Sequence, residues 1–400
     1  MTLNRKRGQH EGNIYRRADG RWEGRLRVGY RNGKRSRRSV FGRTRVEVAK
    51  KLTQLQRDHE LGILGNPGRV TIAQFLDQWM AESAQPRLRP KTYGSYQQVI
   101  RLHITPYLGH HPIQKLTPQH VQAWTNELSR SGWKRKRTQA DDAAQRPEQR
   151  GVSPRTIHYA RAILRAALQQ ALRWGIVQRN VATLITPPRM VKREIRPLEP
   201  QQARDLIAAA QSHRLGVLVT TACALGLRQG EALGLKWADV DLNGGLLHVR
   251  HALQRIGGTW TLVEPKSARS RRAIALPRIV TAALKAHRTT QLEERLAAGQ
   301  DWENYDFVFC TKTGLPLDPS NAKRVFRMLL KAANVPIIRF HDLRHTAATL
   351  LIAQGVNPRD VAEILGHSSV SLTMNTYAHA LDSRKHDAAR RMDDILEGHA

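Results

Sequence analysis

Residues 340–379 read FHDLRHTAATLLIAQGVNPRDVAEILGHSSVSLTMNTYAH, and this segment carries the densest set of structural and chemical signals in the chain. Apolar residues at helical spacing predict a first helix that ends at Gly355. Asn357-Pro358 combines a capping side chain with a proline at the first helical position, so it predicts the start of a second helix. Gly366 predicts the end of that helix.

Four side chains of this segment are candidates for chemistry: His341, Arg344, His367 and Tyr377. The first two are three residues apart and therefore share a helix face, whereas Asp342 points elsewhere. That pairing suits an oxyanion better than a metal ion. His367 falls in the turn after the second helix, and Tyr377 falls in a last short helix. Each also has an ordinary interpretation, as a pair capping a helix start, a solvated histidine, or a tyrosine packed near Leu372 and Met374.

The charge balance is far from ordinary for 400 residues, since 66 Lys and Arg face 33 Asp and Glu and give a net charge of +33. A surplus of this size favours a polyanionic partner, with nucleic acid as the first candidate. A merely soluble basic protein is the alternative. The length predicts two to three domains with substantial cores.

Cysteine usage and hydropathy indicate a cytosolic, soluble protein. Cys223 and Cys310 are isolated and lie in or beside apolar runs, so they form neither a disulfide framework nor a zinc site. The basic N-terminus lacks the apolar core of a signal peptide, and no stretch approaches the ~18 apolar residues of a membrane span.

Residues 1–60 predict a small basic domain. They hold 18 Lys and Arg against 6 Asp and Glu. Turns at Asp19-Gly20 and Asn32-Gly33 separate three runs in which apolar and polar residues alternate, which predicts a three-stranded antiparallel sheet. Thr44 and Glu47 form a capping box before a helix. The open face of such a sheet can enter a major groove, although a solvated sheet is the alternative.

Residues 70–186 predict a bundle of four short amphipathic helices, with caps at Thr71, Thr117 and Ser153. The apolar stripes are assigned to the core. Residues 132–151 form a polar, basic stretch too long for a turn, so a mobile loop is expected. It either touches phosphates or is simply solvated.

The final part, residues 194–400, predicts a mostly helical domain with a small antiparallel sheet. Helices are expected at 201–210, 215–225, 278–298 and 320–333. Strands are expected at 245–250, 260–262 and 272–276, the first two joined by Gly257-Gly258. The predicted fold is therefore multidomain and mainly α, with domains at 1–64, 70–186 and 194–400.

Two further basic residues stand out in this domain. Arg228 follows a helix broken at Gly226 and lies among apolar residues and glycines, so it needs an anion. Glu231 can supply a structural ion pair, and the glycines at 226 and 230 leave room for a phosphate instead. Lys266 lies in a basic turn between two strands, where it is either solvated or able, at a hairpin tip, to reach into a groove.

These residues together match one chemistry. Metal-free phosphodiester transfer needs a nucleophile, cations that stabilise charge on the phosphoryl oxygens, and a proton donor for the leaving hydroxyl. Arginine supplies planar bidentate contacts to phosphate. A two-metal nuclease would need a carboxylate cluster, which the sequence lacks.

The ordered set Arg228, Lys266, His341-x-x-Arg344, His367 and Tyr377 resembles the tyrosine recombinases, specifically phage-type integrases. The phrases GLRQGE, HDLRHT, LGHS and NTYAH resemble the signature boxes of that family. The helical bundle resembles its core-site-binding domain, and residues 10–60 resemble its arm-site-binding module.

The resemblance implies a role for each matched residue. Tyr377 would attack the scissile phosphate, form a 3′-phosphotyrosyl bond and free a 5′-hydroxyl. Arg228 and Arg344 would clamp the phosphate, and Lys266 would protonate the leaving oxygen. The same resemblance has His341 orient or deprotonate the tyrosine, His367 hydrogen-bond the phosphate, and Glu231 fix Arg228. Arg269 or Arg271 could share the role of Lys266.

The resemblance further implies no metal, cofactor or ATP, double-stranded DNA as partner, a tetramer acting through a Holliday junction, and host DNA-bending and directionality proteins. Residues 381–400 resemble a helix that docks onto a neighbouring subunit, with a free surface helix as the alternative. Candidate DNA contacts are Arg21, Arg25, Arg35, Arg37, Lys134, Arg135 and Arg161.

Two other functions remain open from the sequence. A type IB topoisomerase shares the tyrosine chemistry but has no need of a separate N-terminal DNA module. A helix-turn-helix regulator accounts for the rhythm of residues 345–378 but leaves Arg228 and Lys266 unexplained. Formation of a covalent protein–DNA adduct distinguishes the enzymes from the regulator.

Overall fold

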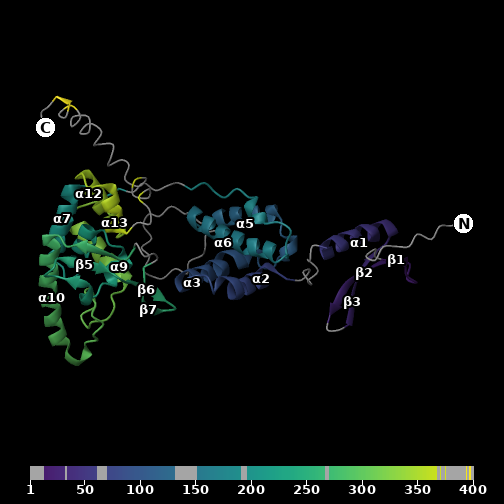
Figure 1. Ribbon diagram of the computed structural model, residues 1–400, viewed down its shortest axis with the longest axis horizontal. Coiled ribbons are helices and arrows are strands. Elements are labelled where there is room, and N and C mark those ends of the chain that lie inside the picture. The colour runs from purple at the N-terminus through teal and green to yellow at the C-terminus, as the bar shows by residue number, and fades with distance from the viewer. Residues whose placement is uncertain are drawn as a thin grey trace. The chain divides into compact units, whose positions relative to one another are not determined.

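The computed structural model describes residues 13–31, 34–60, 70–130, 151–190, 196–265 and 270–366, together with Val370, Met374, Asp393, Leu396 and Glu397. Its internal contacts divide the chain into two units, Met1–Val191 and Lys192–Ala400. Figure 1 shows the elements of each unit. No helix within these ranges is both long enough and apolar enough to span a membrane.

The N-terminal module is the predicted three-stranded sheet with one helix. Strands β1 (Asn13–Arg16), β2 (Trp22–Arg31) and β3 (Lys34–Gly42) pair antiparallel in chain order, and α1 (Arg45–Glu60) follows. Helix α1 packs on one sheet face, where a Cβ on Gly24 would lie 2.8 Å from Val48 Cγ1. The predicted alternation along β2 is interrupted, because the register shifts between Arg27 and Gly29.

The predicted caps of this module are present. Gly20, at a φ of 81°, forms the turn between β1 and β2, and its N–H donates to the carbonyl of Arg17. The Thr44 hydroxyl accepts a hydrogen bond from the N–H of Glu47, whose carboxylate accepts the N–H of Arg43. The turn predicted at Asn32-Gly33 lies outside the described residues.

The helical domain contains the four predicted helices, and its described residues include a further short helix, α4, that the sequence did not indicate. Its helices are α2 (Ile72–Trp79), α3 (Pro90–Val99), α4 (Thr105–Leu108), α5 (Pro118–Arg130) and α6 (Pro154–Arg173). Single π-helical turns, Met80–Ala84 and Ile100–Ile104, extend α2 and α3. The predicted apolar stripes are buried and form one core that includes Phe75, Leu76, Val121, Trp124, Ile157, Ile163 and Leu164.

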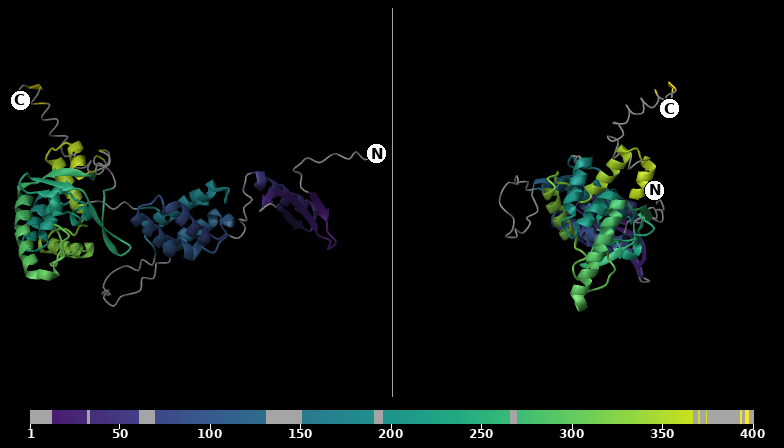
Figure 2. Two further views of the ribbon diagram at one scale, coloured as in Figure 1. Left: turned by 60° about the horizontal axis from the view of Figure 1, so that its bottom comes forward. Right: turned by 90° about the vertical axis from the view of Figure 1, so that its left-hand side faces the viewer.

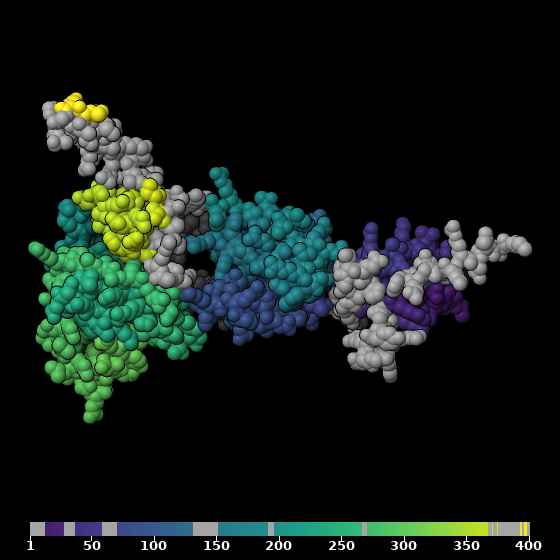
Figure 3. All heavy atoms as spheres, viewed as in Figure 1, coloured from purple at the N-terminus to yellow at the C-terminus, as the bar shows by residue number. Residues whose placement is uncertain are grey.

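The C-terminal domain is built around buried helices. Its helices are α7 (Pro200–Ala210), α8 (Gly216–Leu225), α9 (Gln229–Leu233), α10 (Arg278–Ala298), α11 (Pro319–Ala332), α12 (Asp342–Ala353) and α13 (Pro358–Leu365). Helix α8 is nearly all apolar and contacts α7, α10 and α12, so it forms the centre of the core. Figure 3 shows α12 and α13 together on one face, in yellow-green.

The strands of this domain pair differently from the prediction. Strands β4 (Val240–Asp241), β5 (Leu246–Val249) and β8 (Arg272–Ala275) form one sheet in the order β4-β5-β8. Strand β6 (Ala252–Ile256), which the sequence did not reveal, pairs with β7 (Thr259–Val263) across Gly257-Gly258. Figures 1 and 2 show β6 and β7 as a hairpin projecting from the domain.

Candidate active site

The Arg228–Glu231 pair predicted from the sequence is present at the start of α9. Arg228 occupies the N-cap position, and its N–H and Nη1 donate to the two carboxylate oxygens of Glu231 at 3.0 and 2.6 Å. The pair spans one helical turn, as its spacing predicts. The Arg228 side chain remains 37% exposed, whereas Glu231 is 4% exposed. The guanidinium is therefore fixed from inside the protein and accessible from outside.

Glu231 also holds a second arginine, which the sequence did not single out. Arg272 on β8 donates from Nη2 to Glu231 Oε2 at 3.0 Å, and its side chain is only 6% exposed. Burial raises the pKa of Glu231, but the Arg272 and Arg228 cations outweigh that effect and lower the pKa below its ordinary value. The carboxylate therefore stays ionised at neutral pH.

Gly226 and Gly230 do not leave room for a ligand, which corrects one interpretation drawn from the sequence. A Cβ on Gly226 would lie 2.3 Å from Leu365 Cδ2, and one on Gly230 would lie 3.1 Å from the carbonyl oxygen of Leu253. Protein atoms fill both spaces. The glycines instead allow α13 and β6 to pack closely against the α8–α9 turn.

Substitution of Gly226 by alanine is expected to lower the free energy of unfolding by about 2 kcal/mol or more. Its φ of 60° is costly for a residue with a Cβ, and the added methyl group meets Leu365. Gly245→Ala is the matched control, because φ is 67° there but no atom lies within 4 Å. Denaturant unfolding should show the larger loss for Gly226→Ala; equal losses would contradict the packing argument.

Arg344 reaches the same turn from α12. Its Nη1 donates to the carbonyl oxygen of Gly226 at 3.0 Å, two residues before Arg228. The side chain is 2% exposed, making it one of the largest fully buried side chains among the described residues. The neighbouring α12 residues Leu343 and Ala347 are buried as predicted. One turn of backbone thus brings together two arginines that lie 116 residues apart in the sequence.

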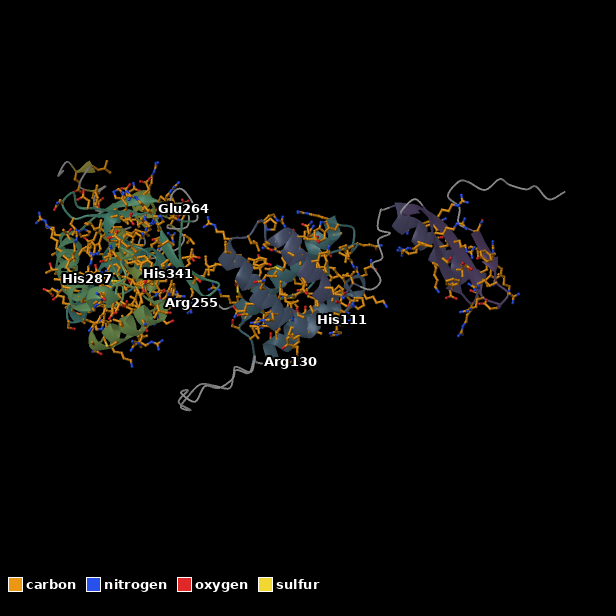
Figure 4. All side chains as sticks on the ribbon, turned by 90° about the horizontal axis from the view of Figure 1, so that it is seen from below. His111, Arg130, Arg255, Glu264, His287 and His341 are labelled. Carbon is orange, nitrogen blue, oxygen red and sulfur yellow. The ribbon has the colours of Figure 1, made fainter. Side chains whose placement is uncertain are left out.

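His341 immediately precedes α12 and belongs to the same cluster. Desolvation by the surrounding protein lowers its pKa below the ordinary 6.5, and the nearby Arg344 and Arg228 cations lower it further. Its ring is therefore neutral at neutral pH and able to accept a proton. Figure 4 labels His341 in the C-terminal domain and Arg255 on the β6–β7 hairpin.

A second histidine adjoins this cluster. His345 lies one turn further along α12, and its ring meets that of His341 edge-on with centroids 5.4 Å apart. Burial, followed by the effect of His341, lowers the pKa of His345 to about 4. No role was predicted for it, although the four-residue spacing from His341 could have indicated the contact.

The end of α13 contacts both Arg228 and Arg272. Gly366, at a φ of 65°, ends this helix as predicted, and its carbonyl oxygen accepts a hydrogen bond from Arg228 Nη2 at 2.9 Å. The carbonyl of Ile364 accepts one from Arg272 Nε. His367 and Tyr377 lie outside the described residues, as do most residues of the predicted helices at 371–379 and 381–400.

Lys266 also lies outside the described residues, but the strands on either side of it correct its predicted setting. Strand β7 pairs with β6, whereas β8 pairs with β5. The two flanking strands therefore belong to different sheets and do not form a hairpin with Lys266 at its tip. Arg271 is exposed next to β8, and Arg269 falls outside the described residues.

The candidate DNA contacts lie in several settings. Arg25 and Arg37 are exposed, and alternation along β2 places Arg25 on the sheet face opposite α1. Arg21 pairs with Asp19 at the turn. Arg35 lies in β3, Lys134 and Arg135 fall outside the described residues, and Arg161 donates to the carbonyl of Ala182 within the helical domain.

The open face of the N-terminal sheet has a carboxylate at its centre. Glu23 is buried and accepts hydrogen bonds from Tyr15, Arg17, Arg25 and Ser39 at 2.6 to 3.4 Å. The hydrogen bond from Arg25 is the largest of several effects that lower the pKa of Glu23 to about 2. Glu23 therefore holds Arg17 and Arg25 in place at any physiological pH.

Two family models match the chain. Residues 196–384 match the model of the phage integrase family, and residues 71–129 match the phage integrase N-terminal SAM-like domain. Together they cover more than half of the chain, and the first contains Arg228, His341, Arg344 and Tyr377. The chain is a tyrosine recombinase of the phage integrase family.

The recombinase is similar in sequence to individual integrases and tyrosine recombinases along nearly its whole length. It is 29% identical to an integrase from Saccharopolyspora erythraea, over 96% of each chain. It is also 29% identical to a XerC-like tyrosine recombinase from Caldanaerobacter subterraneus, over 91% of this chain and 93% of that one.

Solved structures share the fold of the recombinase. The Tn1549 transposon integrase in complex with transposon right end DNA matches with a TM-score of 0.65 and 22% identity, over 82% of this chain and 99% of that one. A lambda integrase dimer bound to a core site matches with a TM-score of 0.54 and 20% identity, over 93% and 96%. The mainly helical, multidomain fold predicted from the sequence is therefore confirmed, and so is the family.

Proposed function

We propose that this site-specific recombinase binds double-stranded DNA and exchanges strands through a covalent bond between Tyr377 and a 3′-phosphate, so as to integrate or excise a mobile element. The main support is the cluster at the α8–α9 turn. There Arg228 is fixed by Glu231, Arg344 reaches the Gly226 carbonyl, and His341 stands close to both. Two cations and a neutral base are among the groups that phosphoryl transfer requires.

The reaction conserves phosphoester bonds. The Tyr377 oxygen attacks phosphorus, the bond to the 5′-oxygen breaks, and the tyrosine proton passes to His341. Lys266 donates a proton to the leaving oxygen, and His367 hydrogen-bonds the phosphate. Attack by a second 5′-hydroxyl reverses these steps and joins the new strand, so no ATP is consumed.

The two arginines have different access to a phosphate. Arg228 is 37% exposed, and its Nη1 and Nη2 each donate one hydrogen bond within the protein, so its remaining N–H groups can bind a non-bridging oxygen. Arg344 is 2% exposed, so its contact with phosphate requires that DNA binding uncover the guanidinium. Formation of the complete clamp is therefore coupled to DNA binding.

The role of His341 predicts a specific pH dependence of strand cleavage. Its pKa lies below 6.5, so the ring is neutral at pH 7 and above and becomes protonated only on acidification. The single-turnover cleavage rate should be flat near neutrality and fall only on acidification below the ordinary histidine pKa of 6.5, where protonation removes the base. His341→Asn should be slower and lack this fall, whereas the control His345→Asn should retain it. Persistence of the same fall in His341→Asn would exclude His341 as the base.

The N-terminal module is proposed to bind arm sites through the sheet face opposite α1. Arg25 and Arg27 are exposed on that face, and Arg37 lies directly across from Arg27. Replacing both Arg25 and Arg27 by glutamine should make the slope of log affinity against log salt shallower by about 2, if each contacts one phosphate. The control replaces Arg45 and Lys50, exposed on α1, and should leave the slope unchanged. Full-length protein and a duplex carrying the repeats that flank the core site are required.

The helical domain is proposed to bind the core site, and four protomers to assemble on two sites and pass through a Holliday junction. A solved lambda integrase tetramer bound to a Holliday junction supports this proposal. Host DNA-bending and directionality proteins are proposed as further partners. Sizing of the protein with two core-site duplexes should give a complex of four protomers, and a complex that stops at two would contradict the proposal.

The function as a whole is tested with a nicked duplex that carries the recombination site. The expected result is a covalent adduct with this duplex and joined products from two intact sites. Supercoil relaxation without joining between sites would favour the topoisomerase activity instead. DNA binding without any adduct on a validated site would contradict the proposed chemistry.

A further inference from the structure

Arg272 is a buried cation to which neither the sequence nor the proposed mechanism assigns a role. It lies at the start of β8, with its side chain 6% exposed. Its guanidinium donates in three directions: Nη2 to Glu231, Nη1 to the carbonyl of Ser270 at 3.1 Å, and Nε to the carbonyl of Ile364. It therefore ties β8 to α9 and to the last turn of α13.

Arg272 and Arg228 donate hydrogen bonds to the same two parts of the protein, the Glu231 carboxylate and the end of α13. Glu231 gives Oε1 to the Arg228 side chain and Oε2 to Arg272. At the end of α13, Arg272 takes the carbonyl of Ile364 and Arg228 takes that of Gly366. Both acceptors of Arg228 are therefore held in place by neighbouring contacts with Arg272.

Lysine could not reproduce this arrangement. An ammonium is a compact charge, whereas the planar guanidinium directs separate N–H groups to a carboxylate and two carbonyls. The buried cation also carries a desolvation cost, which lowers the pKa of Arg272 despite the opposing effect of Glu231. A site that needed Glu231 only as a partner for Arg228 would not require this second buried cation.

We propose that Arg272 is a positioning residue for the recombinase reaction, holding both the Arg228 guanidinium and the end of α13 that leads into His367. It does so through Glu231 on one side and the Ile364 carbonyl on the other. Arg272 does not touch the phosphate. This inference rests on the proposed role of Arg228 in binding the scissile phosphate.

The test compares Arg272→Lys with wild type and Arg228→Lys on two nicked substrates. One carries the normal scissile phosphate, and the other carries a methylphosphonate, which lacks the negative charge that Arg228 neutralises. Arg272→Lys should slow adduct formation on the phosphate by about 10-fold or more while binding the site with nearly wild-type affinity. On the methylphosphonate, the defects of both variants should shrink together. The double variant should form the adduct at a rate close to that of Arg228→Lys alone. Independent roles would instead multiply the two single rate reductions.

A merely structural role predicts a different pattern. Loss of folded protein slows the reaction equally on both substrates and lowers the melting temperature, and that result would overturn the inference. Glu231→Gln is the second variant, because it keeps the shape of the shared acceptor but removes its charge, and it should show the same substrate dependence. Arg250→Lys is the control, since Arg250 pairs with Asp239, in the 3-10 turn before β4, and should leave both rates unchanged.

The failure of the inference can be told apart from failure of the proposed function. If wild type forms no adduct, or if Arg228→Lys is as active as wild type, the proposed role of Arg228 is wrong. If Arg228→Lys is impaired while Arg272→Lys cleaves at the wild-type rate, only the positioning role of Arg272 is wrong.

Discussion

Replacing Tyr377 by phenylalanine is expected to abolish the covalent adduct and all strand joining, while affinity for the site stays within about twofold of wild type. This is the largest effect that we expect of any single substitution. Phenylalanine lacks the phenolic oxygen that forms the bond to phosphorus but preserves the aromatic ring. No other group can replace that oxygen in the covalent step. The measurement is a denaturing gel of protein with a labelled, nicked site, together with a binding titration.

The matched control is Tyr305→Phe, because Tyr305 is exposed in the same domain but remote in sequence from the boxes that resemble the family. It should form the adduct at the wild-type rate. An adduct that persists in Tyr377→Phe would show that another residue is the nucleophile, and peptide mapping of the labelled adduct would then identify it.

Arg344→Lys is expected to have the second largest effect, slowing adduct formation by about 10²–10³-fold. Lysine retains the positive charge but cannot contact the phosphate in a bidentate manner while donating to the Gly226 carbonyl. The defect should appear in the rate of adduct formation under single-turnover conditions, with the affinity for DNA little changed. The comparison therefore separates the geometry of the guanidinium from its charge.

Arg359→Lys is the control for this substitution, since Arg359 is a largely exposed arginine of the adjacent helix α13. It should cleave as fast as wild type. Because Arg344 is buried, melting temperatures of both variants must accompany the rates. A rate within threefold of wild type for a folded Arg344→Lys protein would contradict the proposed clamp.

Local signals in the sequence predicted much of this fold. The caps at Thr71, Ser153 and Asn357 all accept the expected backbone N–H groups. Helices end at Gly226 and Gly366 as predicted, and both glycines have a positive φ. Each signal depends on interactions within a few residues, and this is why it could be recognised without knowledge of the fold.

Features that depend on distant partners were not predictable in the same way. Strand β5 pairs with β8 rather than with the next strand in the chain, and the short strand β6 shows little alternation of apolar and polar residues. The role of Gly226 in packing against Leu365 depends on a contact across 139 residues. Residue patterns do not encode such pairings directly, because they follow from the packing of the whole domain.

In the candidate site, too, local contacts could be predicted from the sequence and long-range contacts could not. The Arg228–Glu231 pair could be predicted, since its partners lie one helical turn apart. Arg272 could not, because its contacts with Glu231 and Ile364 span 41 and 92 residues. It stands at the end of a run of basic residues, where only the fold distinguishes the buried Arg272 from the exposed Arg271 beside it.

The hydrogen bonds from Arg228 and Arg272 to the carbonyls at the end of α13 link the activity of the enzyme to its stability when these arginines are mutated. Carbonyls in the last turn of a helix lack partners within that helix, so side chains important for the site also supply part of the stability of α13. A mutation that improves one property by altering these arginines therefore alters the other. Variants with greater thermal stability should be sought elsewhere, for example on the exposed surface of α10, where stability and activity can be adjusted independently.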